Sequence, residues 1–184
     1  MWAIGDADET LESSSSTMES RAEQIRYLIH FIGDVHQPLH AATYFSSQFP
    51  GGDAGGNAWK VAGVPYATEL HAVWDEGLGM WTSQLHRPLN STGFEWVKSL
   101  STKVISEFPL NSFLPQVKNS NVTEWAEESY TIAKTFVYTA PQAPEPIPSS
   151  YLLEGQKAAL QRLALAGYRL AETLYVLLPY PILP

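Results

Sequence analysis

The chain has 184 residues, 45% of them hydrophobic, which is enough for one globular domain with a sizeable core. Nineteen Asp and Glu against eleven Lys and Arg give a formal net charge of −8, which excludes a broad cationic surface for nonspecific binding to a nucleic-acid backbone. The sequence contains no cysteine, so disulfides and thiolate metal sites are excluded and any metal must be held by His, Asp, Glu or backbone oxygen. We find no transmembrane run, no signal peptide at Met1 and no evident protein partner, and localisation stays open.

The first predicted helix covers about residues 17–34. Ser16 followed by Glu19 forms a possible capping box at its start. Pro38 lies beyond its expected end, because proline lacks the backbone donor that a helix interior needs. Apolar residues recur at helical spacing between these limits, namely Ile25, Leu28, Ile29 and Ile32.

A long irregular loop and a shorter helix are predicted next. Residues 46–66 are rich in Gly and Pro, which is typical of loops that carry function. Pro65 then lies where a second helix can start, and Gly77 and Gly79 can close it. The apolar face of this helix is expected to hold Leu70, Val73 and Trp74.

Three more helices follow, and together they predict an all-α fold in a single domain of residues 1–184. Val97, Leu100, Val104 and Phe108 mark the first of them. Residues 121–138 form the next, and a proline-rich linker leads to a last helix over about residues 149–178. Its expected buried stripe consists of Leu160, Leu163, Gly167, Leu170, Leu174 and Leu177, and Gly167 can permit close helix approach.

Three of the five histidines fall in the segment HFIGDVHQPLH, residues 30–40. His30 and Asp34 are four residues apart and share one helix face, and His71 and Asp75 repeat that spacing. Either pair alone is compatible with a structural hydrogen bond. Two pairs, with His40 just beyond the first, instead favour a metal site, because imidazole and carboxylate groups suit zinc.

The segments HFIGDVHQPLH and ELHAVWDEGLG resemble the zinc-dependent class I nuclease and 3'-nucleotidase family of single-strand-specific nucleases, whose fold is shared with zinc phospholipase C. Similarity continues through GGDAGGN, WAEESYTIAKTFVY and ALQRLALAGYRLAETL, so it covers about residues 22–178. The resemblance implies a multi-helix fold and three zinc ions in one cleft that activate water for attack on phosphorus. It also implies single-stranded nucleic acid or nucleotides as binding partners.

The resemblance assigns a role to each member of the two pairs. His30 matches a ligand of the first zinc of a close pair, and Asp34 matches the catalytic carboxylate that bridges this pair. His40, His71 and Asp75 match the three ligands of the remaining zinc. We expect the chain to bind zinc at these positions.

Other residues have two interpretations each. Asn57 in GGDAGGN matches an asparagine that contacts substrate in relatives, although such Asn-Gly segments also simply shape turns. Trp59 and Tyr66 could stack on bases or belong to the core. His36 is expected to be a buried hydrogen-bonding residue, and His86 a surface residue.

The sequence also departs from the family pattern. The family supplies further zinc ligands upstream, beginning with a tryptophan and an early histidine, whereas no histidine precedes His30. The chain therefore resembles the C-terminal two-thirds of the family domain, N-terminally truncated, with about one zinc expected. The predicted function is a zinc-dependent nuclease and 3'-nucleotidase, weak or inactive as this chain alone. The alternative is a truncated, catalytically impaired helical zinc-binding domain.

Overall fold

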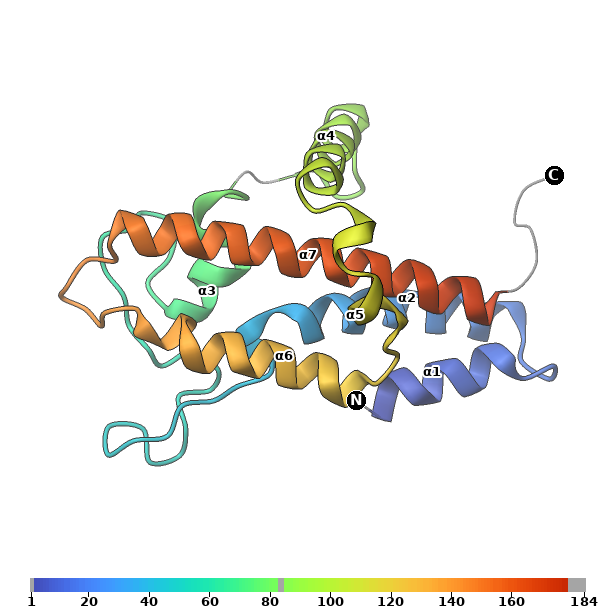
Figure 1. The fold of residues 1–184 in the computed structure, drawn as a ribbon, viewed down its shortest axis with the longest axis horizontal. Coiled ribbons are helices and arrows are strands. Elements are labelled where there is room, and N and C mark those ends of the chain that lie inside the picture. Colours follow the sequence, from blue (N-terminus) through green and yellow to red (C-terminus); the bar gives the residue numbers. More distant parts are fainter. Residues whose placement is uncertain (1, 83–84, 179–184) are drawn as a thin grey trace.

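The structure is a computed structural model that describes residues 2–82 and 85–178. Helices are the main elements of this part of the chain (Figure 1). These helices are α1 (Trp2–Glu12), α2 (Met18–His36), α3 (Leu70–Asp75), α4 (Ser91–Glu107), α5 (Leu114–Lys118), α6 (Val122–Thr135) and α7 (Ser149–Leu177). Extended pairing within the described residues is limited to two isolated bridges, Lys60 with Glu69 and Ala62 with Pro146. The predicted all-α class is confirmed.

The long helix α7 spans the molecule and organises the others (Figure 1). Helix α2 packs against α7, α6 and α1, and α4 and α5 pack against α7. The 3-10 turn η1 (Pro38–His40), which follows α2, packs against α6, and the turn η2 (Gly77–Gly79), which follows α3, packs against α7. These contacts bring the ends of α2 and α3, the two histidine-bearing elements, to the same part of the fold.

Helix α2 confirms the first predicted helix and extends it to His36. Its N-cap is Thr17 rather than Ser16, because the Thr17 hydroxyl accepts a hydrogen bond from the Ser20 amide at 3.1 Å. The helix ends at His36, two residues beyond the predicted end at about residue 34 and still before Pro38, as expected from the missing donor. The expected apolar face is wrong at Ile29, which is 52% exposed.

Helix α3 begins at Leu70, so the prediction that it starts near Pro65 is wrong. The amide of Val61 donates to the Thr68 carbonyl at 3.0 Å, and the amide of Leu70 donates to the Trp59 carbonyl at 2.9 Å. These bonds fold residues 59–70 back on themselves, and backbone groups used in this way cannot continue a helix. The irregular conformation predicted for residues 46–66 is confirmed.

Helix α7 confirms the last predicted helix, but its buried stripe differs from the expected one. Leu163 and Gly167 are exposed, and a Cβ added at Gly167 would meet nothing within 4 Å. Close helix approach occurs at Gly155 instead, where an added Cβ would overlap Leu78. Two arginines, Arg162 and Arg169, occupy buried positions on this helix.

Two helices were not predicted from the sequence, α1 and α5. Helix α1 buries Ile4, Ala7 and Leu11, residues whose spacing of three and four is helical and could have been recognised. Helix α5 is only five residues long and gives too short a periodic signal. Among the described helices, none is long and apolar enough to cross a membrane.

Candidate metal centre

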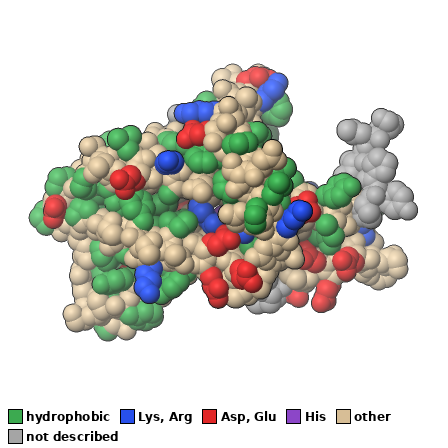
Figure 2. Space-filling model, in the orientation of Figure 1, with side chains coloured by type: hydrophobic (Ala, Val, Ile, Leu, Met, Phe, Trp, Pro, Cys, Tyr) green, Lys and Arg blue, Asp and Glu red, His purple; other side chains and the backbone are tan. Residues whose placement is uncertain are grey.

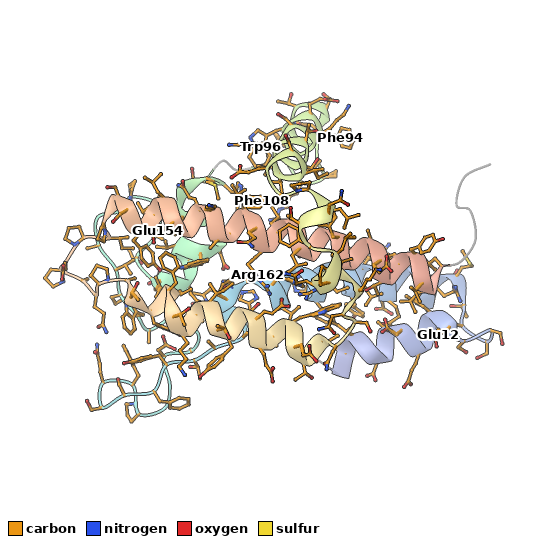
Figure 3. The ribbon with its side chains drawn as sticks, in the orientation of Figure 1. Glu12, Phe94, Trp96, Phe108, Glu154 and Arg162 are labelled. Carbon is orange, nitrogen blue, oxygen red and sulfur yellow. The ribbon has the colours of Figure 1, made fainter. Side chains whose placement is uncertain are left out.

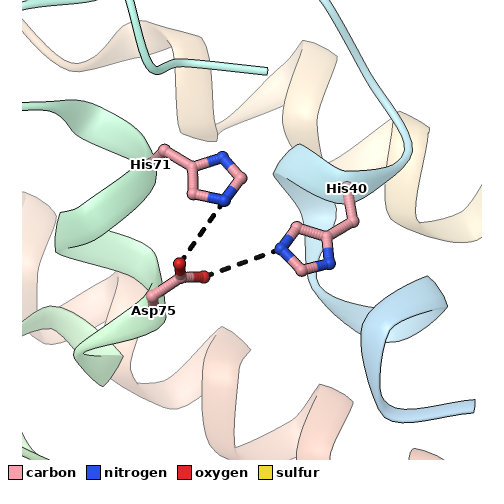
Figure 4. A group of neighbouring side chains, drawn as sticks. All are labelled: His40, His71 and Asp75. Carbon is pink, nitrogen blue, oxygen red and sulfur yellow. Dashed lines mark ion pairs between the residues drawn. The ribbon is translucent and has the colours of Figure 1, made fainter. Parts of the chain in front are cut away.

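Two neighbouring elements present the histidines of the candidate centre. His40 closes η1, and the side chain of Gln37 caps this turn by accepting a hydrogen bond from the Leu39 amide at 2.5 Å. His71 and Asp75 lie on α3, four residues apart and therefore on one face. The fold thus places His40, from the turn that follows α2, opposite both side chains of α3 (Figure 4).

His40, His71 and Asp75 offer three ligand atoms that all lie within 4.8 Å of one another. The Asp75 carboxylate faces the Nε2 atoms of both rings, with Oδ2 3.4 Å from His71 Nε2 and Oδ1 3.7 Å from His40 Nε2 (Figure 4). The imidazole rings face each other with centroids 5.1 Å apart. All three side chains remain partly accessible to solvent.

This geometry fits a tetrahedral zinc ion. Zinc bound to nitrogen and oxygen at 2.0–2.2 Å holds its ligand atoms roughly 3.3 Å apart. The two separations from Asp75, which are measured from Oδ2 and Oδ1 respectively, are slightly longer than this value, and the three ligand atoms lie within 4.8 Å of one another, so the side chains must draw closer to bind one ion. Three protein ligands leave the fourth position open, which is the pattern of catalytic zinc sites.

His71 is held in an orientation suited to a ligand. Its Nδ1 lies 2.7 Å from the carbonyl oxygen of Gly55, which can only accept a hydrogen bond, so Nδ1 carries the proton. In the neutral ring, which is the form that binds a metal, the lone pair then lies on Nε2, the nitrogen 3.4 Å from Asp75 Oδ2. A hydrogen bond of this kind fixes both the tautomer and the ring plane of a metal-binding histidine.

The loop that supplies the Gly55 carbonyl is organised by Asp53, which is fully buried. Its carboxylate accepts hydrogen bonds from the Tyr44 amide at 2.8 Å, the Gly56 amide at 2.9 Å and the Tyr138 hydroxyl at 3.0 Å. Gly55 has a φ of +63°, and a Cβ there would lie 2.5 Å from the Leu39 carbonyl oxygen. Glycine is therefore required where this loop passes η1 and turns toward α3.

Charges around the cluster favour a cation. The Asp75 carboxylate raises the pKa of His40, an effect that burial partly opposes. Burial would raise the pKa of Asp75, but its contacts with His40, Gln37 and His71 outweigh burial and lower it. No Lys or Arg of the described chain forms an ion pair with Asp75. Among the described residues, the partners of the ionised carboxylate are therefore two imidazoles and one amide.

The second predicted pair lies beside this cluster but outside it. His30 Nε2 is 3.2 Å from Asp34 Oδ2 on α2, where His30 is exposed and Asp34 is half-buried. Asp34 Oδ1 lies 3.6 Å from His40 Nδ1, the nitrogen that faces away from Asp75. The structure thus brings Asp34 next to the cluster, while His30 contacts Asp34 alone among the candidate ligands. The roles of both residues as ligands stay predictions.

The other candidate residues have mixed outcomes. Asn57 is exposed, and its Nδ2 donates to the Ala54 carbonyl at 2.8 Å, so it shapes its turn, and substrate contact stays a prediction. Trp59 is buried in the core, which excludes it as a stacking platform. Tyr66 is half-buried and packs against the same core cluster. His86 is exposed, as expected.

His36 is buried, as predicted, and belongs to a charged network that the sequence did not reveal. Its Nδ1 donates to the Ile32 carbonyl at 2.7 Å, and its Nε2 accepts from Arg169 at 2.8 Å. Arg162 extends from α7 into the space facing α6, where it pairs with Glu128 at 2.8 Å (Figure 3). Arg169 binds the other Glu128 oxygen at 2.7 Å. We call these four residues the buried charge network.

The pKa values in this network follow from burial and from the two guanidinium groups. Burial, reinforced by the charge of Arg162, lowers the pKa of His36 to about 3, so the ring is neutral. Burial would raise the pKa of Glu128, but hydrogen bonds and charges of Arg169 and Arg162 outweigh it and lower it. The only sequence signal was the spacing of the two arginines, seven residues apart and hence on one face of α7.

Comparison with known proteins gives a consistent result. A family model described as S1/P1 Nuclease matches residues 1–178 and so includes α1, upstream of the segments in which the resemblance was found. Nuclease P1 of Penicillium citrinum is 29% identical over 181 residues, which cover 92% of this chain and 63% of that protein. Endonuclease 3 of Arabidopsis thaliana is 29% identical over 172 residues, covering 90% of this chain and 55% of that protein. The chain thus spans less than two-thirds of the length of these relatives.

Proposed function

Because the chain belongs to the S1/P1 nuclease family, we propose that it binds zinc through His40, His71 and Asp75 and hydrolyses phosphate esters of single-stranded nucleic acids and nucleotides. The observation that carries this proposal is the convergence of three zinc-type ligand atoms from η1 and α3. The substrates proposed are single-stranded RNA and DNA and nucleoside 3'-phosphates.

The chemistry of the substrate explains why such a centre is useful in this chain. A phosphodiester is anionic, and bound zinc neutralises it and lowers the pKa of water. Figure 2 shows acidic side chains gathered over α6 and α1, a surface that repels phosphate. The chain as a whole also carries a formal net charge of −8, so we assign the attraction of the substrate to the metal centre rather than to a field of lysines.

The protein residues have separate tasks in this proposal. His40, His71 and Asp75 hold the metal, and the Gly55 carbonyl keeps the His71 tautomer that binds it. Asp34 lies close enough to His40 to polarise its ring from the far side. The glycine-rich loop of residues 51–57 passes directly beside His71 and can approach a ligand of the site.

One observation favours a second candidate, a zinc-binding domain with little turnover. His30 and Asp34 have no third His or carboxylate atom grouped with them in the described part of the chain. A second metal held by this pair alone would be weakly bound. If turnover in the family needs paired metals, as the resemblance implies, the isolated chain will cleave slowly.

The deciding experiment combines metal analysis with hydrolysis. We expect purified protein to retain about one zinc per chain, as a site of three ligands and water requires. Hydrolysis of single-stranded RNA and of adenosine 3'-phosphate is then measured in chelator and in zinc. Zinc-dependent cleavage that is lost in His71→Ala and retained in His86→Ala supports the nuclease.

Each other outcome has a clear meaning. One tightly bound zinc without cleavage of either substrate supports the second candidate. Three tightly bound zinc ions would show that the three-residue assignment is incomplete. Protein that binds no zinc would contradict both candidates.

A further inference from the structure

Gln37 connects the two elements that carry the candidate metal ligands. Its Oε1 accepts a hydrogen bond from the Leu39 amide at 2.5 Å, which caps η1 immediately before His40. Its Nε2 donates to Asp75 Oδ1 at 2.9 Å, across 38 residues of sequence. One side-chain amide thus contacts both the turn that presents His40 and the carboxylate that faces it.

The orientation of this amide is determined by its partners. The Leu39 amide can only donate and therefore needs Oε1, while the ionised Asp75 can only accept and therefore needs Nε2. A flipped amide would place its NH2 group against the Leu39 amide, donor against donor, and its oxygen against the Asp75 carboxylate, acceptor against acceptor. Both ends of the Gln37 side chain are consequently fixed.

The hydrogen bond from Gln37 also constrains Asp75. The Asp75 side chain is 49% exposed and lies in the last turn of a six-residue helix, so little packing restrains its rotation. Gln37 engages Oδ1, the oxygen that faces His40, and leaves Oδ2 directed at His71. Without this donor the carboxylate can rotate away from the point where the three ligand atoms converge.

We propose that Gln37 is a positioning residue for the metal centre, which orients Asp75 through its amide and ties α3 to the turn carrying His40. This inference rests on the proposed metal centre. Hydrogen-bonding partners of metal ligands typically change metal affinity by about 10–100-fold when removed. Gln37 has the geometry of such a partner for a carboxylate, as the Gly55 carbonyl has for His71.

Two substitutions separate positioning of Asp75 from capping of η1. Gln37→Ala removes both hydrogen bonds. Gln37→Asn keeps a side-chain acceptor of the type preferred at helix starts, but it is one methylene too short to reach Asp75. Gln48→Ala is the matched control, because the Gln48 amide pairs with Gln142 at 2.8 Å in an exposed position away from the cluster.

The experiment measures zinc affinity by competition with a chromophoric chelator, the visible spectrum of bound Co²⁺, and the melting temperature in chelator. We expect Gln37→Ala and Gln37→Asn to weaken zinc binding about 10–100-fold and to alter the Co²⁺ spectrum. Gln37→Asn should melt near the wild-type temperature without metal. Gln48→Ala should match wild type in all three measurements.

A double-mutant cycle supplies the stricter test. In an Asp75→Ala background, Gln37→Asn should cause no further loss of zinc affinity, because its target is absent and a side-chain acceptor for η1 is kept. In a His71→Ala background its effect should persist. Wild-type affinity in Gln37→Asn, or full additivity with Asp75→Ala, would overturn the positioning role while leaving the metal centre intact. A wild-type protein without zinc affinity would overturn both.

Discussion

Two clusters in this molecule each combine histidine with a carboxylate, include histidines only four residues apart in sequence, His36 and His40, and have opposite properties. The candidate metal centre joins His40 and His71 to Asp75 in a partly exposed position, with no guanidinium or ammonium paired to the carboxylate in the described chain. The buried charge network joins His36 to Glu128, whose two oxygens are bound by two arginines. The first leaves a carboxylate available for a cation, and the second has satisfied it within the protein.

The comparison shows that histidine beside a carboxylate does not by itself define a metal site. His36 and His40 belong to one short motif, yet one faces Arg169 and the other faces Asp75. A nearby guanidinium supplies the positive charge that a metal would otherwise supply. The following predictions test this distinction, because the buried charge network should respond to neutralisation of its charges and the metal centre to zinc.

The largest effect is expected from Arg169→Met. This change removes two hydrogen bonds to Glu128 and one to His36 from a buried position. Breaking a buried ion pair by removing one partner costs roughly 3–5 kcal/mol, and the loss should be equal in chelator and in zinc. Urea denaturation under both conditions measures it, with exposed Arg26→Met as the control. A loss that zinc reverses would place Arg169 in the metal centre.

His71→Ala should show the reverse dependence on metal. Zinc at about 100 times its dissociation constant should stabilise the wild-type protein by about 2.7 kcal/mol, and the variant should lose this gain. In chelator the variant should lose mainly the hydrogen bond to Gly55, about 0.5–1.5 kcal/mol, beside its contacts with Asp75 and the His40 ring. Melting curves in chelator and in excess zinc provide the comparison. Equal losses under both conditions would make the contact between His71 and Asp75 structural.

Acid should destabilise the buried charge network through His36. Its pKa falls from 6.5 to about 3 on folding, so below pH 6.5 the unfolded chain binds a proton that the folded chain does not. The contribution of neutral His36 to the free energy of unfolding is therefore fully present above pH 6.5. It decreases as the pH falls, by about 2 kcal/mol between pH 7 and pH 5. Denaturation in chelator at several pH values measures this slope.

His36→Gln is the matched variant for this titration, because the amide does not protonate in this range. Its stability should be flatter with pH across the same interval, whatever its absolute value. The lowered pKa of Glu128 adds a further loss at more acidic pH, since its pairing with Arg169 and Arg162 requires the ionised form. An unchanged slope in His36→Gln would assign the acid sensitivity to other groups.

The smallest effect is expected from His30→Ala. The contact of His30 with Asp34 is exposed, and exposed pairs contribute about 0–1 kcal/mol. His30 also lies outside the three-ligand cluster, so the tightest zinc should bind with nearly unchanged affinity. Zinc titration beside His86→Ala tests this expectation. A large loss of affinity for that zinc would move His30 into the candidate metal centre.

The fold was predictable from sequence wherever the periodic hydrophobic pattern extends over many residues. Residues spaced three and four apart indicated helices α2, α4 and α7, and α6 was also predicted. Helix α3 was placed too early, because hydrogen bonds to the preceding loop, which periodicity does not report, occupy the backbone around Pro65. Periodicity also does not report which apolar residues of a long helix are exposed, and Leu163 faces solvent where the apolar stripe was expected.

Sequence alone determined the local part of the candidate site. The four-residue spacing within each pair places His30 beside Asp34 and His71 beside Asp75, because that spacing is close to one helical turn. The motif strings also sufficed to indicate the nuclease family, which the family match confirms.

Tertiary structure decided everything that joins distant segments. It brought His40 to Asp75, Gln37 to the same carboxylate, and the Gly55 carbonyl to His71. It also directed two arginines of α7 onto Glu128 and His36, and so made one histidine structural and left another free for a metal. Local spacing fixes which face of a helix a side chain occupies, whereas the packing of α2, α6 and α7 fixes which charges that face meets.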